Sequence, residues 1–485
     1  MTEKQNTVSV PPLSSRLAET HPERARLFYP FSYVLNDEAL REHCWFCLAP
    51  GTCGDPPSKK PQSQGDRPPK VKLSRCKGCL TAVYCDETCQ RYSWFDHKLE
   101  CKYFKAKRTR PPEKHVRMLA LTVYRYKTIQ AGRDKKHAQE FYHKRTHSRP
   151  VMDLMSHEED FRSDQVAMDY FEETYKALMK WTQNADEFKD KELVFQLFCR
   201  VRINQISISN TDYTGVIGQG LYPDLASYDH SCRPNASCAA VDGFTVLLWA
   251  LDATIDVHNT ERTFIAYIDL MKPRHDRRIT LKGTWYFDCE CVRCRDDVDD
   301  IISSIKCPNC TKPVYVYGSH ALKATSTGLA FVCAHCKFIC DADVVDKACE
   351  AMVNLKTIMD AGTLEKESNA LEMAEGLIEF YSDVLPPVNV HLAQLCLLTI
   401  RLTPASDVTN RLRLSLLSLD TMRVCFAQSW PLGYHLCNTG MYAAKLLQTK
   451  LAVQCFTEAL NILSRALGSE HPMTLTANQE LQKLL

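Results

Sequence analysis

Cysteine and histidine residues occur in closely spaced groups in this sequence, and such spacing is typical of zinc coordination. The first group supplies eight candidate ligands: Cys44, Cys47, Cys76, Cys79, Cys85, Cys89, His97 and Cys101. A structural zinc ion takes four such ligands in a tetrahedron, so this group predicts two ions. We expect an interleaved arrangement, with Cys44, Cys47, Cys85 and Cys89 on one ion and Cys76, Cys79, His97 and Cys101 on the other; sequential pairing is the alternative.

Two further cysteine groups follow in the second half of the chain. The segment YFDCECVRC supplies Cys289, Cys291 and Cys294, which is one ligand short of a closed tetrahedral site. The candidate for the fourth ligand is Cys232, in the stretch DHSCRPN. The segments CPNC and CAHC form a self-contained zinc ribbon pattern, with the ligands Cys307, Cys310, Cys333 and Cys336. The sequence therefore predicts three to four zinc ions.

The stretch DHSCRPNASC, residues 229–238, is suited to a tight loop. Asp, Ser and Asn side chains bond their own backbone, and Pro234 lacks a backbone donor, so the stretch is a poor helix and a poor strand interior. Loops of this kind commonly carry functional residues. We therefore expect a functional site around this loop, next to the zinc ligand Cys232.

Composition limits the class of protein. Its 485 residues suffice for roughly two to four domains. With 60 Lys and Arg against 58 Asp and Glu, no global basic field indicates a nucleic-acid partner, and the basic segment 59–77 leaves that alternative open. The N-terminus carries no signal-peptide pattern, and no apolar run is long enough to span a bilayer. The 24 cysteines fit zinc binding in a reducing compartment, so we expect an intracellular protein of the nucleus or cytoplasm without a membrane partner.

Hydrophobic periodicity indicates the elements that must position these residues. Apolar residues recur at helical spacing from about 113 to 200, and again from 341 to the end. Between 201 and 268 the pattern changes to short β-branched runs separated by Gly, Pro and Asn. Near the N-terminus, the segment RLFYPFSYVL predicts one strand or the edge of a hairpin. The sequence thus predicts a β-rich region between two helical ones.

Taken together, these motifs resemble a known family. The string CxxC…CxxC…YCxxxCQxxxWxxHKxxC is similar to the MYND zinc finger, whose family binds proline-rich peptides near a Gln and a Trp, here Gln90 and Trp94. DHSCRPN resembles the NHSCxPN motif of SET domains, FIAYIDL resembles their catalytic-tyrosine strand, and WYFDCECVRC resembles a post-SET zinc segment. From about residue 30 onward, the chain is similar to the SMYD family of SET and MYND domain lysine methyltransferases.

The resemblance implies a multidomain α+β fold. A β-rich SET core with a pseudoknot is interrupted by the MYND finger and a helical insert, and an all-α domain similar to tetratricopeptide repeats closes the chain. Gly440, Ala452, Phe456 and Ala459 match positions of one such repeat, for which an ordinary amphipathic hairpin is the alternative. The domains would be 1–43 (atypical N-terminal part of the SET region), 44–101 (MYND finger), 102–200 (helical insert), 201–268 (SET core), 269–296 (post-SET zinc region), 297–340 (zinc ribbon) and 341–485 (C-terminal helices).

The resemblance also implies transfer of a methyl group from S-adenosylmethionine to a lysine of a histone or non-histone protein. Free lysine has a pKa of about 10.4, so an aromatic channel would favour the neutral amine that accepts the methyl group. By motif position, Tyr267 would be the catalytic tyrosine, and Trp285 would line the lysine channel with it. The residues in contact with the cofactor would be Asn210, Asp229, His230 and Phe287.

Two features differ from the family pattern, and both lie on the cofactor side. No glycine precedes Gly51, so the Gly-x-Gly turn with which the family opens is not found. Asp229 stands where the family has Asn, and an ionised carboxylate only accepts hydrogen bonds. These differences support a second hypothesis from another class, a zinc-binding adaptor with weak or no catalysis that recruits proline-rich partners through the MYND finger.

Overall fold

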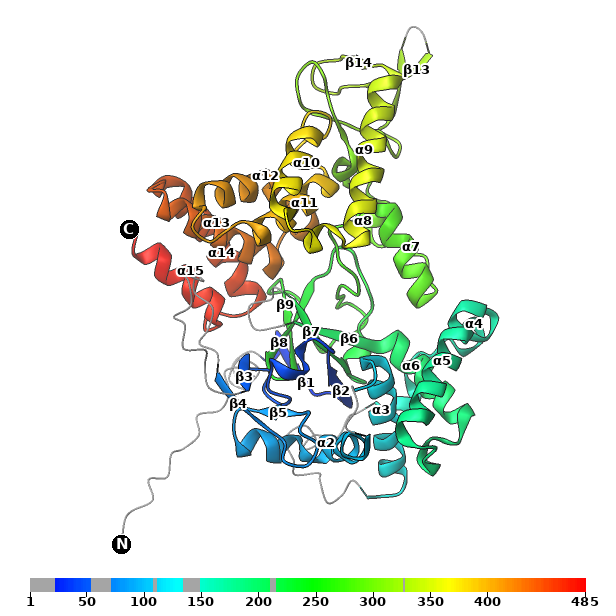
Figure 1. Ribbon diagram of the computed structural model, residues 1–485. Coiled ribbons are helices and arrows are strands. Elements are labelled where there is room, and N and C mark those ends of the chain that lie inside the picture. Colours follow the sequence, from blue (N-terminus) through cyan, green and yellow to red (C-terminus); the bar gives the residue numbers. More distant parts are fainter. Residues whose placement is uncertain (1–21, 54–70, 108–110, 134–148, 210–214, 326–327) are drawn as a thin grey trace.

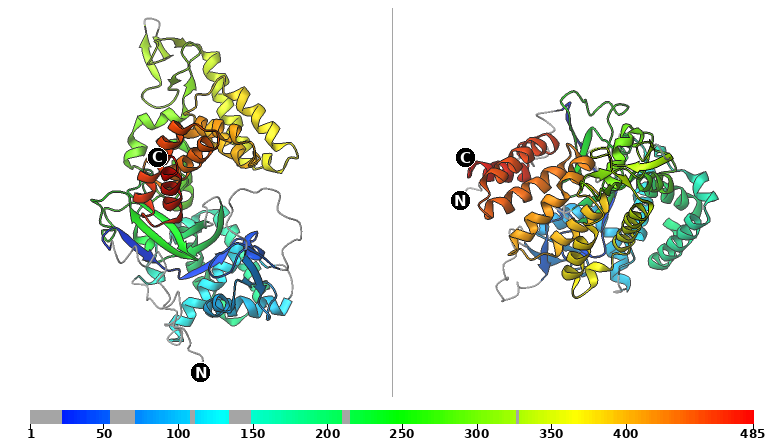
Figure 2. Two further views of the ribbon diagram at one scale, coloured as in Figure 1. Left: turned by 90° about the vertical axis from the view of Figure 1, so that its left-hand side faces the viewer. Right: turned by 90° about the horizontal axis from the view of Figure 1, so that it is seen from above.

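The computed structural model of the chain describes residues 22–53, 71–107, 111–133, 149–209, 215–325 and 328–485. Figures 1 and 2 show two lobes: the N-terminal half of the chain, blue to green, forms one, and the C-terminal helices, yellow to red, form the other. Within the described ranges, no helix combines the length and the apolar character that crossing a membrane requires. The chain thus forms a mixed α+β structure with several small sheets.

Two antiparallel three-stranded sheets form the β-rich part of the first lobe. In spatial order, the strands are β1 (Ala25–Phe28), β9 (Thr245–Ala250) and β8 (Ala236–Asp242) in one sheet, and β2 (Ser32–Leu35), β7 (Val216–Leu221) and β6 (Gln205–Ser209) in the other. The chain leaves after β2 and returns with β6, which pairs with the same neighbour as β2. The cysteine-rich and helical segments between these strands are therefore insertions into the β-rich part.

Two predictions about strands differ from the structure. The N-terminal segment forms two strands that join different sheets, because Pro30 lies between them and lacks the backbone donor that a continuous ladder needs. The segment FIAYIDL is not a strand; Ile265 alone makes a bridge, parallel to His230. Its backbone is held by the DHSCRPN loop instead: Ile265 N–H donates to the Asp229 carbonyl, and its carbonyl accepts from Ser231 N–H, both at 3.0 Å.

The inserted segments consist of a small sheet and a group of helices. The strands are β3 (Gly51–Cys53), β4 (Val71–Arg75) and β5 (Val83–Tyr84), and the helices are α2 (Glu87–Lys107), α3 (Lys114–Gln130), α4 (Glu158–Ser163), α5 (Gln165–Thr182) and α6 (Lys191–Asn204).

Arg117 on α3 connects α2 with strand β2. Its buried guanidinium donates to Glu100 of α2 at 2.7 Å and to the Leu35 carbonyl of β2 at 3.1 Å. A charge pair held in this way fixes the cysteine-rich segment against the sheet.

The remainder of the chain is mostly helical, apart from short strands around the predicted zinc ribbon. Those strands are β10 (Ile305–Lys306), β11 (Pro313–Val314), β12 (Leu322–Thr325), β13 (Gly328–Val332) and β14 (Ile339–Cys340). The helices are α7 (Arg274–Trp285), α8 (Val292–Arg295), α9 (Ala342–Ala361), α10 (Ala370–Tyr381), α11 (Val390–Leu402), α12 (Val408–Phe426), α13 (Trp430–Lys445), α14 (Thr449–Ala466) and α15 (Pro472–Gln482). The helical pattern predicted beyond residue 341 is thus the one observed.

Helices α13 and α14 approach each other closely at a glycine. A Cβ atom added to Gly440 would lie 2.9 Å from the ring of Phe456, so no larger residue fits without displacement. Ala452, Phe456 and Ala459 are fully buried in the same hydrophobic core. The residues that matched the repeat pattern therefore lie at a real helix contact.

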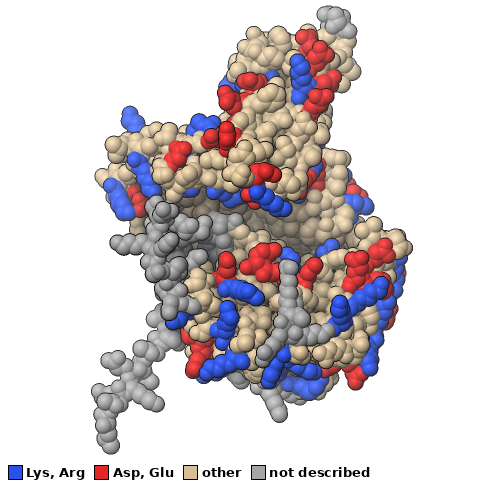
Figure 3. All heavy atoms as spheres, viewed as in Figure 1, with Lys and Arg blue, Asp and Glu red and all other residues tan. Residues whose placement is uncertain are grey.

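The two lobes share a buried interface. Ala239 and Leu251 of the β-rich part, together with Met271, belong to the same hydrophobic cluster as the cores of α12 to α14. Gln394 of α11 adds a hydrogen bond to the Met271 carbonyl at 2.8 Å. On the face drawn in Figure 3, the surface is hollowed between the lobes.

Candidate functional site

A cavity of about 1300 Å³ lies beside the DHSCRPN loop. Its lining includes five of the residues predicted to contact the cofactor or the substrate lysine, and they come from the loop, the tyrosine-bearing segment and the end of α7. These residues are Asp229, His230, Tyr267, Trp285 and Phe287. Asn210, the remaining candidate for cofactor contact, lies outside the described residues.

The loop and the tyrosine-bearing segment are joined by the side chain of Asn235 as well as by backbone bonds. Its carbonyl oxygen accepts from Phe264 N–H at 2.7 Å, and its amide donates to the Arg262 carbonyl at 2.8 Å. An Asn side chain has the donor and the acceptor that both bonds need. The sequence therefore encodes, within the loop itself, the contact that holds the neighbouring segment in place.

His230 and Tyr267 form a neutral pair at the cavity wall. His230 Nδ1 accepts from the Tyr267 backbone N–H at 3.0 Å, and burial lowers the pKa of His230 to about 4. The imidazole is therefore neutral at pH 7, with its proton on Nε2. The Tyr267 hydroxyl donates to the Tyr228 carbonyl at 2.6 Å. Burial, with an added effect of the Asp229 carboxylate, raises the pKa of Tyr267, so the phenol stays protonated.

Aromatic rings extend this wall from the end of α7. Trp285 Nε1 donates to the Ile203 carbonyl at 2.8 Å, and the Trp285 ring lies 5.4 Å from that of Tyr267. Tyr286 between Trp285 and Phe287 has a positive φ of 58°, which is rare for an aromatic residue. This left-handed turn at the end of α7 lets Trp285, the last residue of the helix, and Phe287, two positions further on, both reach the cavity.

Several other cavity residues were missed from the sequence. Arg149, Arg202, Gln219 and Cys238 line the same cavity. Arg149 is anchored by bonds to backbone carbonyls, and the Arg202 guanidinium lies 5.2 Å from the ring of Tyr170. Each lies in an ordinary helical, strand or connecting pattern, so only the tertiary pairing brings it to the cavity. Of these four residues, only Cys238 could have been predicted from the sequence, because it falls within the DHSCRPNASC stretch that is expected to surround a functional site.

The predicted zinc ligands converge into four groups, in each of which the donor atoms lie within 4.8 Å of one another. The groups are Cys44, Cys47, Cys85 and Cys89; Cys76, Cys79, His97 and Cys101; Cys232, Cys289, Cys291 and Cys294; and Cys307, Cys310, Cys333 and Cys336. The first two groups have the interleaved arrangement, so the sequential alternative does not apply. We call the third group the loop cluster and the fourth the ribbon cluster.

The geometry of these groups fits zinc. Sulfur atoms bound to one zinc ion at about 2.3 Å lie roughly 3.8 Å apart. The Cys76 and Cys101 sulfurs are 3.9 Å apart, and those of Cys232 and Cys294 are 3.6 Å apart. His97 Nε2 lies 3.5 Å from Cys79 Sγ, and burial lowers the pKa of His97 to about 3, which favours the neutral imidazole that binds a metal.

The loop cluster touches the cavity directly. Cys232 N–H donates to Cys291 Sγ at 3.3 Å, and His230 Nε2 lies 3.2 Å from Cys232 Sγ. Cys289 and Cys291 also line the cavity. Metal binding at the loop cluster therefore fixes the residues on both sides of the candidate active site.

Gln90 and Trp94, the candidate peptide-binding residues, lie one turn apart on α2, and neither is among the residues that line the cavity. Trp94 is 47% exposed although its ring packs 6.1 Å from that of the zinc ligand His97. Most of the basic segment 59–77 lies outside the described residues, so its candidate role in nucleic-acid binding stays a prediction.

Comparison with known proteins identifies the first cysteine-rich segment and relatives of the chain. The family model for the MYND finger matches residues 44–101. The chain is 30% identical over 231 residues to the histone-lysine N-methyltransferase SMYD3 of Homo sapiens, which covers 48% of this chain and 51% of that protein. It is also 27% identical over 266 residues to the N-lysine methyltransferase SMYD2 of Bos taurus. That match covers 54% of this chain and 53% of SMYD2. The matches thus span about half the length of these relatives.

Proposed function

The chain belongs to the SMYD family, and on that premise we propose that it is a protein-lysine N-methyltransferase that uses S-adenosylmethionine. The observation that carries the proposal is the cavity in which Tyr267, Trp285 and Phe287 lie around a zinc-linked loop. Its volume of about 1300 Å³ exceeds the usual range of small-molecule sites and leaves room for a cofactor and a side chain together.

The cavity residues fit the chemistry of this cofactor. S-adenosylmethionine supplies an electrophilic methyl group on a cationic sulfur. Aromatic faces and the Asp229 carboxylate attract a cation, whereas Arg149 and Arg202 suit a carboxylate. The Phe287 ring offers a stacking surface for adenine. We assign the cofactor to the part of the cavity between Phe287, His230 and Asp229.

The substrate lysine would enter along Trp285 and Tyr267. Burial among these aromatic rings disfavours the ammonium form and leaves the amine lone pair free for in-line attack. Tyr267 stays a phenol, so its hydroxyl can orient the amine without competing as a nucleophile. Substrate proteins, histone or non-histone, are part of the same proposal.

The proposal is tested by transfer of a labelled methyl group from S-adenosylmethionine to histones and to a panel of non-histone proteins. Tyr267→Phe should abolish the transfer, whereas the control Tyr317→Phe should not, because Tyr317 is 48% exposed and its hydroxyl donates to Cys349 Sγ. Equal transfer by wild type and Tyr267→Phe would contradict the assigned site.

A second candidate function rests on a separate surface. Trp94 exposes a large aromatic side chain one turn from Gln90, and such a residue suits the flat rings of a proline-rich peptide. We propose that this surface recruits proline-rich partners, whether or not the cavity is catalytic. Binding of a fluorescent proline-rich peptide should be lost in Trp94→Ala and kept in Tyr267→Phe; peptide binding unaffected by Trp94→Ala would refute it.

A further inference from the structure

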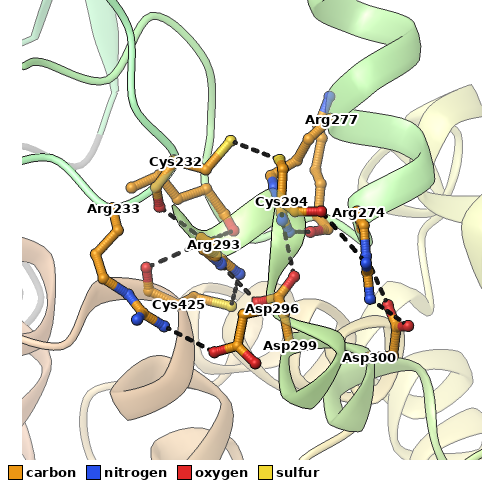
Figure 4. A network of polar contacts seen from close by, with 12 residues as sticks. Cys232, Arg233, Arg274, Arg277, Arg293, Cys294, Asp296, Asp299, Asp300 and Cys425 are labelled. Atoms are coloured by element: carbon orange, nitrogen blue, oxygen red, sulfur yellow. Dashed lines mark hydrogen bonds and ion pairs between the residues drawn. The ribbon is translucent and has the colours of Figure 1, made fainter. Parts of the chain in front are cut away.

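Two arginine side chains are buried beside the loop cluster (Figure 4). Arg277 on α7 is 0% exposed and Arg293 on α8 is 1% exposed. Both donate to the same carboxylate, that of Asp299: Arg277 Nη2 at 2.7 Å and Arg293 Nε at 2.6 Å. Asp299 is itself only 4% exposed, so water does not screen these charges.

The buried trio is not neutral. Two guanidinium groups share one carboxylate, which leaves one positive charge without an ionised partner inside the trio. A buried charge without a partner is strongly destabilising. The neighbouring Arg274 pairs with two carboxylates, Asp297 and Asp300, so that second group carries one net negative charge; those carboxylates bond to Arg274, whereas Arg277 and Arg293 bond to Asp299.

The loop cluster places further negative charge directly against Arg277. Arg277 Nη2 lies 3.7 Å from Cys294 Sγ, and Arg277 Nε is buried without a hydrogen-bond partner among the described residues. A zinc ion with four thiolates carries two net negative charges. The metal-loaded cluster would therefore compensate the arginines, and the arginines would stabilise its thiolates.

Arg293 also connects three separate segments. Its Nη1 donates to the Leu270 carbonyl at 3.0 Å, with longer contacts to the carbonyls of Cys232 at 3.4 Å and Cys425 at 3.5 Å. Cys425 lies in the last turn of α12, where backbone carbonyls lack helical partners and attract a cation. One side chain thus bridges the cavity loop and a helix of the second lobe, as Figure 4 shows.

We propose that Arg277 and Arg293 are positioning residues of the loop cluster. They offset the negative charge of its zinc-bound thiolates, and Arg293 in addition holds the end of α12 against the cavity loop. This inference rests on zinc binding by the loop cluster and not on methyl transfer, so it stands or falls separately from the proposed enzyme activity.

The test follows zinc retention cysteine by cysteine in the full chain. Zinc-loaded protein is challenged with a chelator, alkylated with iodoacetamide and mapped by peptide mass spectrometry. Arg293→Met and Arg277→Met should speed alkylation of the loop cluster about 10- to 100-fold, the usual effect of removing a residue that supports metal ligands. The ribbon cluster, in the same molecule, should be alkylated at the wild-type rate.

Two further variants separate charge from packing. Arg293→Lys keeps the charge and should stay within about threefold of the wild-type rate, because a buried lysine can still offset the cluster. Arg295→Met removes an arginine that is 69% exposed and should have no effect. Wild-type rates in both methionine variants would overturn the proposal, as would Arg293→Lys alkylation as fast as that of Arg293→Met.

Folding controls and hydrogen exchange complete the test. If the cysteines of all four clusters in a methionine variant are alkylated together, that variant has unfolded, and Arg293→Lys becomes the deciding variant. Selective loss of zinc from the loop cluster of Arg293→Lys would refute charge compensation. Retention of that zinc would support it. Lysine lacks the guanidinium that bonds the carbonyls of Cys232, Leu270 and Cys425. In Arg293→Lys, amide hydrogen exchange at the end of α12 should therefore rise, while exchange in α14 is unchanged. Unchanged exchange at the end of α12 would refute the bridging role.

Discussion

At the scale of single residues, Tyr267 is fixed at both ends. Its backbone N–H donates to His230 Nδ1 at 3.0 Å, and its hydroxyl donates to the Tyr228 carbonyl at 2.6 Å. These bonds place the phenol at the cavity wall, and burial keeps it protonated by raising its pKa. A hydroxyl placed in this way can act on a substrate amine without reorganisation of the site.

Removing that hydroxyl should affect turnover and not cofactor affinity. We expect Tyr267→Phe to lower the rate of methyl transfer about 100-fold or more, because a group that acts in the transition state is lost while the ring is kept. Initial rates measure the first quantity, and calorimetric titration with S-adenosylmethionine measures the second. An equal loss of rate and of cofactor affinity would show that Tyr267 serves binding instead.

A second residue-scale prediction concerns pH. His471, at the N-terminus of α15, accepts from Met473 N–H through Nδ1 at 3.3 Å, and burial lowers its pKa to about 4. Its unfolded pKa is about 6.5, so the unfolded state binds the proton first as the pH falls. This contribution to stability is complete above pH 6.5 and decreases between about pH 6.5 and pH 4, by about 2 kcal/mol at pH 5.

The pH effect is measured with a variant that caps the helix without titrating. We expect the free energy of unfolding of His471→Asn to fall less than that of wild type between pH 7 and pH 5, because Asn is also a good capping residue. Denaturant unfolding at both pH values gives the comparison. Identical pH dependence of the two proteins would exclude His471 as a contributor.

At the scale of elements, the contact between α13 and α14 depends on a glycine. We expect Gly440→Ala to destabilise the protein by about 1–3 kcal/mol, because its Cβ would overlap the Phe456 ring. Gly376 on α10 is the matched control: a Cβ there meets nothing within 4 Å, so Gly376→Ala should stabilise the helix by up to about 1 kcal/mol. Thermal unfolding of both variants measures the difference, and equal shifts would contradict the close contact.

The elements also show what could be predicted from the sequence. The zinc ligands could be predicted, because short Cys spacings place two ligands on one ion and the ligand number completes each tetrahedron; the choice between interleaved and sequential pairing in 44–101 depends on the fold. The pairing of β1 with β9 could not, since it joins residues over 200 positions apart with no local signal. The same limit applies to Arg149 and Arg202, which reach the cavity only through tertiary packing. Tyr267, Trp285 and Phe287 were selected through motif resemblance, and their roles stay predictions.

At the scale of the whole molecule, the zinc clusters serve different parts. The loop cluster adjoins the cavity, whereas the ribbon cluster lies beyond it among β10 to β14. We expect Cys232→Ser to lose one zinc ion and cofactor binding together, and Cys310→Ser to lose one zinc ion with cofactor affinity within about twofold of wild type. Metal analysis and calorimetry test both variants. Cofactor binding that survives Cys232→Ser would separate the cavity from its zinc.

The most direct test of the proposed active site is calorimetric titration of S-adenosylmethionine into the zinc-loaded protein. Phe287→Ala removes the proposed adenine surface, and Phe380→Ala, 70% exposed on α10, is the control. We expect wild type and the control to bind equally and Phe287→Ala to bind at least about tenfold more weakly, as loss of one aromatic stacking contact implies. No binding by folded wild type, or equal binding by Phe287→Ala, would contradict the assignment of this cavity to the cofactor.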